Sequence, residues 1–416
     1  MKAVKEPITI PIPRQKDCAR YKMHKYWASK PWYVVKAYIE HFTEQGDIVL
    51  DPFCGSGVVA CEALIARRKV IANDLNPIAT FITRNTCHAP VDLVELENVF
   101  KKIESEVKDE IMEMYKSDMS CPNCDKNMYQ KHVVRGPAVG EDWIVEARCV
   151  TDYGGCGKGK KRYLITPHEK QKILQIEKES ENEIEKRGLW IPQYKFPEKF
   201  ESNRITYKGM KTVDSLFTKR NLLALSILFK NIQNNIGKPI KNFVLLGLSN
   251  SILHCSKLKA ENVRPMSVNG YWVPEDWIEE NVWLRFKNRF YWHWGVLRGK
   301  KETNELINNY FRDANCFEDL KKDKNFLLLN QSALKLNNIP NNSVDYCFTD
   351  PPYGGSIQYE ELTLLWRSWL GLADEETEKV LREKELIVNK YHPKDLNKYN
   401  EMLTDAIKEI YRVLKE

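Results

Sequence analysis

The sequence has no long hydrophobic run. Its longest uninterrupted apolar stretches, such as Phe243–Leu246, are far too short for a membrane-spanning helix, which needs about 20 residues. The N-terminal stretch Met1–Pro13 alternates apolar residues with prolines and has no apolar core of the kind that a secretory signal needs. We therefore expect neither a membrane anchor nor a secretory leader, and a cytoplasmic location.

Positive charge is only slightly in excess of negative charge. The 64 Lys and Arg residues face 57 Asp and Glu residues, which gives a formal net charge of +7. This balance is compatible with a nucleic-acid partner but does not require one. Without a secretory signal, the 11 cysteines indicate reduced thiols or metal ligands rather than disulfides. A length of 416 residues, 43% of them hydrophobic, predicts two or three domains with a sizeable core.

Two separate segments alternate strands with helices, a pattern typical of a parallel sheet covered by helices. The first has helix 34–42, strand 47–50, helix 58–66 and strand 69–72, and the second has strands 326–329 and 344–348 and helix 360–370. About 240 residues between them follow neither pattern. We expect 1–95 and 320–416 to form two halves of one α/β domain, 96–165 a helix plus a cysteine-rich module, and 166–319 a helical insertion.

A glycine loop follows the first strand of the first segment. Asp51-Pro52-Phe53-Cys54-Gly55-Ser56-Gly57 leads directly into a helix, and glycines there let backbone N–H groups approach a ligand. The next strand ends at Asp74, at the distance where an acidic residue commonly binds a ribose hydroxyl pair. Asp51 could meet a positively charged end of a cofactor. The alternative is a structural turn with a capping aspartate. The third glycine of the dinucleotide fingerprint is missing, which disfavours a dehydrogenase.

The second segment contains Asp350-Pro351-Pro352-Tyr353 directly after an apolar strand. Two prolines fix the backbone and remove two N–H donors, so a carboxylate and carbonyl oxygens face one space. If Asp350 and the Pro351 carbonyl accept the two N–H bonds of an exocyclic base amine, its lone pair can aim at the sulfonium methyl of S-adenosylmethionine. Tyr353 offers a surface on which a flipped base can stack. A rigid structural turn is the alternative.

No cysteine follows a proline in this loop, and Cys347 lies before the turn, within the strand. Methylation of cytosine carbon 5, which needs a cysteine nucleophile, is therefore not expected. Transfer to an exocyclic amine needs no covalent enzyme intermediate.

Four cysteines have the arrangement of a structural zinc site. Cys121-Pro122-Asn123-Cys124 is a knuckle that can present two thiolates to one ion, and Cys149 and Cys156 follow at a wider spacing. Two alternatives stay open, namely that His132 replaces one thiolate or that Cys149 is only a buried strand residue. Because four protein ligands leave no open position, we expect no catalytic role for the ion.

These motifs resemble those of adenine-specific DNA methylases that contain a zinc ribbon, within the amino-methyltransferases. The stretches that carry the likeness are Met23–Trp32, Val49–Pro77 and Asp350–Leu362, with Trp366 and Trp369 beyond. The resemblance implies a Rossmann-like methyltransferase sheet, S-adenosylmethionine, zinc and DNA. It also implies residue roles. The cofactor would be bound by Lys30, Pro31, Asp51, Pro52, Phe53, Gly55, Gly57, Asp74, Leu75 and Asn76, and the target base by Asp350, Pro351, Pro352 and Tyr353.

The sequence departs from the family at two places. An acidic residue that usually contacts the cofactor's adenine is replaced by Asn330-Gln331-Ser332-Ala333, where Ser332 or Gln331 could substitute. The family's sheet continues with further strands beyond the helix that ends near Glu416. We therefore expect that sheet to be incomplete in this chain and a second polypeptide to supply the missing strands. A strand from the insertion or a compact variant of the fold that covers the edge is the alternative.

DNA contacts are expected in the insertion and after the cysteine-rich module, at 158–162. The aromatic and basic stretch Trp272–Arg298 is a second candidate, although aromatics at this density are more often core. The leading hypothesis is methylation of adenine N6 in DNA. Cytosine N4 methylation, methylation of guanine N2 in RNA, and a non-catalytic DNA-binding subunit remain alternatives.

Overall fold

The computed structural model describes residues 5–204, 209–237, 239–267 and 269–416, so the first four residues of Met1–Pro13 lie outside the described ranges. The chain forms two compact units. Unit 1 comprises 1–93, 292–367 and 371–416, and unit 2 comprises 94–291 and 368–370. Residues 292–319, which the sequence pattern groups with the insertion, thus belong to the same unit as the two βα segments.

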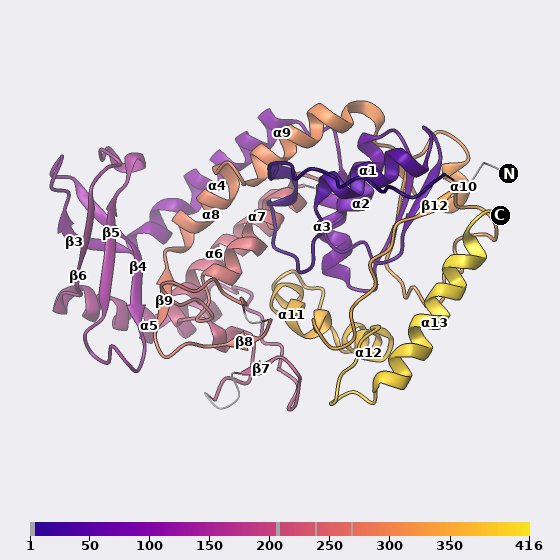
Figure 1. Ribbon diagram of the computed structural model, residues 1–416. Coiled ribbons are helices and arrows are strands. Elements are labelled where there is room, and N and C mark those ends of the chain that lie inside the picture. The colour runs from indigo at the N-terminus through magenta and orange to yellow at the C-terminus, as the bar shows by residue number, and fades with distance from the viewer. Residues whose placement is uncertain (1–4, 205–208, 238, 268) are drawn as a thin grey trace. The chain divides into compact units, whose positions relative to one another are not determined.

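Unit 1 contains a five-stranded parallel sheet (Figure 1). Its strands are β1 (Ile48–Asp51), β2 (Lys69–Asn73), β10 (Asp313–Ala314), β11 (Phe326–Leu329) and β12 (Tyr346–Cys347). Their spatial order is β10-β11-β2-β1-β12, and each neighbouring pair is parallel. The expected parallel α/β sheet is therefore confirmed. β12 is shorter than the predicted strand 344–348, since Val344 forms only an isolated parallel bridge with Leu414.

Helices cover both faces of this sheet. The helices wholly or mostly in unit 1 are α1 (Trp32–Phe42), α2 (Val58–Ile65), α3 (Pro77–Cys87), α9 (Val296–Ile307), α10 (Phe317–Leu320), α11 (Tyr359–Trp369), α12 (Glu375–Lys384) and α13 (Leu396–Val413). Successive side chains of a strand point to opposite faces. In β1, Val49 packs with α1 and α2, whereas Ile48 and Leu50 pack with α10 and Val413 of α13. Burial on both faces explains why the strands read as continuous apolar runs.

Unit 2 combines an antiparallel sheet with helices. Its strands are β3 (Lys116–Ser120), β4 (Asn127–Arg135), β5 (Ile144–Cys149), β6 (Lys160–Leu164) and β9 (Trp277–Glu280), with a separate pair β7 (Asn203–Arg204) and β8 (Tyr271–Trp272). Its helices are α4 (Leu93–Glu113), α5 (Pro167–Lys186), α6 (Lys219–Asn235), α7 (Ile240–His254) and α8 (Val282–Tyr291). A capping box of Thr166 and Glu169 starts α5, which fixes the beginning of this highly charged helix.

The aromatic and basic stretch Trp272–Arg298 contributes to the core. Trp283, Phe286 and Phe290 of α8 are fully buried and pack against Phe100 of α4. Its basic side chains are paired internally, as in the ion pair of Arg285 with Glu280. The core interpretation of this stretch therefore accounts for α8 better than base stacking does. Among the described residues, no helix is long and apolar enough to cross a membrane.

Candidate active site and metal centre

The carboxyl ends of β1 and β12 lie side by side. These strands are parallel neighbours, paired at Val49–Tyr346 and Leu50–Cys347. The glycine loop that follows β1 and the Asp-Pro-Pro-Tyr loop that follows β12 therefore emerge at one edge of the sheet, where open α/β sheets bind their ligands. Two motifs that are far apart in the sequence thus meet in space.

A pocket opens at this edge, with about 980 Å³ of empty space counting its mouth, which is the size range of small-molecule sites. Most of the residues that the sequence assigned to cofactor or base line it. They are Lys30, Asp51, Pro52, Phe53, Gly55, Asp74, Leu75, Asn76, Ser332, Asp350 and Pro352. Pro31, Gly57, Pro351 and Tyr353 do not line the pocket itself. Pro31 is the N-cap of α1, and Tyr353 lies beside the pocket, against Lys30.

The two glycines of the loop have different roles. Gly55 adopts a left-handed conformation at φ +50°, and its N–H donates to Asp74 Oδ2 at 2.9 Å. A side chain at Gly55 would meet the ring of Tyr26 at 3.0 Å. Gly57, at φ +81°, faces α3 instead, where a Cβ would lie 2.9 Å from the Thr83 Cα atom. The first glycine shapes the pocket, and the second allows α2 and α3 to pack closely.

Two carboxylates line the pocket, Asp51, which is buried, and Asp74, which is partly buried. Asp51 is 4% exposed, and burial raises its pKa well above the ordinary value, with further increases from Asp74 and Asp350. Burial raises the pKa of Asp74 to about 6, although the N–H groups of Asn76 and Gly55 donate to its carboxylate and oppose that shift. Such carboxylates favour a cationic ligand, since a positive charge would stabilise their ionised forms.

The Asp-Pro-Pro-Tyr loop is held by contacts on both sides. Lys30 Nζ lies 2.6 Å from Asp350 Oδ2 and 3.5 Å from the Tyr353 hydroxyl, which donates to Asp350 Oδ1. Tyr399 on α13 donates its hydroxyl to the Pro352 carbonyl at 2.6 Å. The Tyr353 ring is 60% exposed beside these groups. The loop thus presents a carboxylate and an open aromatic face together.

Sequence reasoning missed part of the pocket wall. Tyr26 and Tyr359 stack with ring centroids 5.7 Å apart, and Glu385 and Leu386 close the wall after α12. Tyr26 lies within the Met23–Trp32 stretch, so the resemblance pointed to its neighbourhood. Glu385 stands in an ordinary charged helix end and carries no sequence signal, because its position depends on how α12 packs in the fold.

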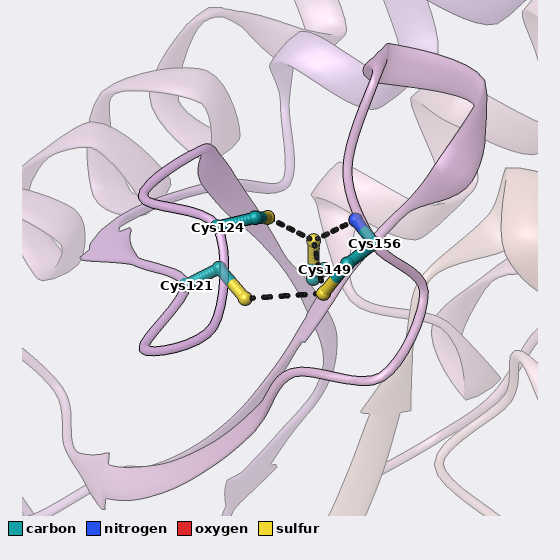
Figure 2. Close-up of side chains that lie close together, drawn as sticks. All are labelled: Cys121, Cys124, Cys149 and Cys156. Atoms are coloured by element: carbon teal, nitrogen blue, oxygen red, sulfur yellow. Dashed lines mark hydrogen bonds between the residues drawn. The ribbon is translucent and has the colours of Figure 1, made fainter.

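Figure 2 shows the four predicted cysteine ligands converging in unit 2. The Sγ atoms of Cys121 and Cys156, and those of Cys124 and Cys149, are 3.6 Å apart, and those of Cys149 and Cys156 are 3.8 Å apart. Tetrahedral Zn–S bonds of about 2.3 Å require S–S distances of about 3.8 Å. The Cys156 N–H also donates to Cys149 Sγ at 3.1 Å. The cluster can therefore hold a zinc ion.

The geometry favours the four-cysteine set over both alternatives for this cluster. Cys149 ends β5 with its sulfur inside the group, so it is more than a strand residue. His132 is a buried residue of β4 and is not one of the converging ligands. Two glycines make the convergence possible, since a Cβ at Gly155 would lie 2.3 Å from Cys149 Sγ and one at Gly159 would lie 2.2 Å from Cys121 Sγ.

Comparison with known proteins adds one finding. Residues 6–84 match the N6 and N4 methyltransferase family model, described as DNA methylase. The matched stretch contains Lys30, the glycine loop and Asp74, which all line the pocket. The match supports a DNA methyltransferase that acts on amino groups, without distinguishing adenine N6 from cytosine N4. No curated protein and no solved structure gives a significant match.

Proposed function

We propose that this chain transfers a methyl group from S-adenosylmethionine to the N6 amine of adenine in DNA, on a Rossmann-like methyltransferase sheet. The observation that carries the proposal is the pocket in which Asp350 lies at the same sheet edge as the glycine loop and Asp74. A DNA methylase match over residues 6–84 favours DNA over RNA as the substrate. Intact catalytic and cofactor loops argue against a purely DNA-binding subunit.

The pocket suits this cofactor by charge. S-adenosylmethionine carries a sulfonium and an ammonium group, and its methyl group is the electrophile of the reaction. Asp51 would bind the ammonium end, and Asp74 would accept hydrogen bonds from the ribose hydroxyls. Ser332, which lines the pocket after β11, would take the place of the acidic residue that the family uses near the adenine ring.

Asp350 has the central role in the proposed chemistry. It would accept an N–H bond of the base amine while the Pro351 carbonyl accepts the other, which draws the nitrogen toward tetrahedral geometry and frees its lone pair. Lys30 pairs with Asp350 in the free protein, and the base amine would displace the Lys30 ammonium from that carboxylate. Tyr353 stacks on the base outside the duplex. The N–CH3 bond would form as the S–CH3 bond breaks to leave S-adenosylhomocysteine, and the proton that the nitrogen loses would pass to solvent. No bond to the protein forms, so positioning and electrostatics drive the transfer.

The cysteine cluster completes the proposal for unit 2. Cys121, Cys124, Cys149 and Cys156 would hold a structural zinc ion, with DNA recognition in the surrounding 96–165 and 166–319 segments. A second polypeptide that pairs with the outer edge of β12 stays a prediction. In the described residues, that edge is paired only by the Val344–Leu414 bridge.

The decisive experiment identifies the product. The purified chain is incubated with isotopically labelled S-adenosylmethionine and with either DNA or RNA of mixed sequence, and the nucleosides are separated by mass spectrometry. We expect labelled N6-methyladenine from DNA. Labelled N4-methylcytosine would correct the base, and label in RNA guanine would overturn the proposal of a DNA enzyme.

A matched pair of variants ties the product to the site. Asp350→Asn should lower methyl transfer at least a hundredfold while cofactor binding, measured by calorimetry, stays within about threefold of wild type. Asp323→Asn, an exposed aspartate of unit 1, serves as the control and should leave both unchanged. If Asp350→Asn kept full activity, the catalytic assignment would fail.

A further inference from the structure

A second group of metal-ligating side chains lies in unit 1, outside the described pocket lining. Glu360 and Glu361 occupy the first turn of α11, and His392 lies between α12 and α13. A carboxylate oxygen of each glutamate and a ring nitrogen of His392 all lie within 4.8 Å of one another. The glutamates are 1% and 3% exposed, so these carboxylates are not solvated surface charges.

Two atoms of this group lack hydrogen-bond partners among the residues that the structure describes. They are Glu360 Oε2 and His392 Nδ1, and both are buried atoms. The other oxygen of Glu360 lies 3.6 Å from Arg382 Nε, which is an ion pair but too long for a good hydrogen bond. An unsatisfied buried polar group costs about 1–3 kcal/mol. Two such atoms in one cluster indicate a partner that protein atoms do not provide.

The charge balance around the group points to a cation. Arg367 forms a bidentate pair with Glu378, which leaves both of those charges neutralised. Three further carboxyl groups, those of Glu360, Glu361 and Glu385, are buried here, with Lys394 buried and Arg382 partly exposed beside them. A positive ion among these carboxyl groups would stabilise their ionised forms.

We propose that Glu360, Glu361 and His392 bind a divalent first-row transition-metal ion, of the Mn²⁺ or Zn²⁺ class. Two carboxylates and one imidazole form a mixed oxygen and nitrogen ligand set, which these ions accept, whereas Mg²⁺ and Ca²⁺ prefer oxygen ligands alone. Water would fill the remaining positions. This set differs in chemistry from the four thiolates of unit 2.

The ion would stabilise the catalytic loop from outside the pocket. Asn389 Nδ2 donates to Glu361 Oε1 at 2.9 Å and to Gln358 Oε1 at 2.8 Å. Gln358 in turn donates to the carbonyls of Gly355, at 3.3 Å, and Val388, at 3.0 Å. This chain of hydrogen bonds joins the metal ligands to the residues that follow Tyr353. Hydrogen-bond partners of this kind orient metal ligands, and metal binding in turn holds those partners in place.

Manganese binding by the full chain tests the proposal independently of methyl transfer. One equivalent of zinc per chain is added first, which the soft thiolates bind in preference to the mixed oxygen and nitrogen ligands, and Mn²⁺ is then titrated while free Mn²⁺ is measured by electron paramagnetic resonance. Thiolates are soft ligands that Mn²⁺ does not prefer, so the thiolate cluster contributes little. We expect one saturable Mn²⁺ per chain. The absence of saturable binding by both Mn²⁺ and additional Zn²⁺ would overturn the proposal.

Variants locate the ion. His392→Ala should weaken Mn²⁺ binding about tenfold or more, because it removes a direct ligand. His41→Ala, at a similarly half-buried histidine of α1, should leave binding unchanged. Glu360→Gln keeps the size of the side chain and should also weaken binding, which gives a second test if one variant folds poorly. Equal binding by wild type and both ligand variants would place the ion elsewhere and refute the assignment.

Discussion

Tyr353 is the residue that tests base stacking most directly. Its ring is largely exposed, while its hydroxyl contacts Asp350 and Lys30. Base–aromatic stacking contributes about 1–3 kcal/mol, so Tyr353→Ala should lower kcat/KM for DNA about 10- to 100-fold. Tyr353→Phe keeps the ring and should stay within about threefold of wild type. Steady-state kinetics on an adenine-containing duplex would measure methyl transfer, and the fluorescence of a duplex with 2-aminopurine in place of the target adenine would measure base flipping separately. Equal losses in the two variants would assign the effect to the hydroxyl and reject stacking.

Gly57 and Gly46 form a matched pair for backbone strain. Both have left-handed φ angles, +81° and +86°, so an alanine at either position costs about 1–2 kcal/mol. Only at Gly57 would the new Cβ meet the Thr83 backbone, at 2.9 Å, whereas nothing lies within 4 Å of one at Gly46. Gly57→Ala should therefore lower the free energy of unfolding by about 1–3 kcal/mol more than Gly46→Ala, measured by urea denaturation. Similar losses would show that α2 and α3 can separate at little cost.

Most of the pocket residues could be predicted because glycine, proline and aspartate are unusual directly after an apolar strand. Glycines and an aspartate after an apolar strand, or two prolines after another, have few structural explanations, so Gly55, Asp74 and Asp350 could be selected from the sequence. The pattern could not tell that Gly57 faces Thr83 and not the pocket. It also could not place Glu385 or Tyr359, because their positions depend on the packing of α11 and α12.

At the scale of elements, the thiolate cluster is the feature with the sharpest expected response. Cys124→Ser should remove the bound zinc, measured by elemental analysis, and increase hydrogen exchange in the β3–β4 and β5–β6 hairpins. These strands share a small apolar cluster that includes all four cysteines, so a zinc ion held there would be a substantial part of their stabilisation. Cys316→Ser, at an exposed cysteine of unit 1, is the control and should change neither quantity. Full zinc content in Cys124→Ser would contradict a four-thiolate site.

The boundaries of an element were predictable where it is an apolar strand covered on both faces. β1, β2 and β11 are mostly apolar and mostly buried, and the ends of their predicted ranges differ from the observed ones by one residue at most. The helix expected in 96–165 is also present, as α4, although it begins three residues earlier, at Leu93. The antiparallel strands β4 and β9 pair across a long sequence separation, and no local pattern in Trp277–Glu280 indicates a partner at 132–135.

At the scale of the whole molecule, the boundaries of the insertion depend on the unit in which each flanking helix is packed. Residues 292–319 belong to unit 1 because α9 packs there. Lys300 of α9 is fully buried, and its ammonium donates to the carbonyls of Asn85 at 2.8 Å and His88 at 2.6 Å, at the end of α3. A buried lysine that satisfies helix-end carbonyls has no signature in composition. The sequence therefore predicts two halves around an insertion but places the second boundary too late to include α9.

Unit 2 should lose stability in acid through one buried carboxylate that lies between two arginines. Glu279 on β9 lies 2.8 Å from a guanidinium nitrogen of Arg220 and 3.0 Å from one of Arg135. Burial alone would raise the pKa of Glu279, but the two arginines outweigh burial and lower it to about 2. A lowered pKa means that this stabilisation is complete above the ordinary value near 4.5 and is lost as the pH falls toward 2.

Glu279→Gln removes the charge between two buried arginines and should lower the free energy of unfolding of unit 2 by about 3–5 kcal/mol at pH 7. In wild type, protonation of Glu279 lowers the free energy of unfolding of unit 2 below about pH 4.5. The variant cannot lose this contribution, so its stability should fall less over the same pH range. The urea dependence of hydrogen exchange in β4 and β9 peptides measures unit 2, with β1 and β2 peptides as the reference for unit 1. Glu275→Gln, at an exposed glutamate just before β9, is the matched control. Equal losses in the peptides of both units would show that the chain unfolds as one cooperative body, so that the network stabilises the whole molecule and not unit 2 alone.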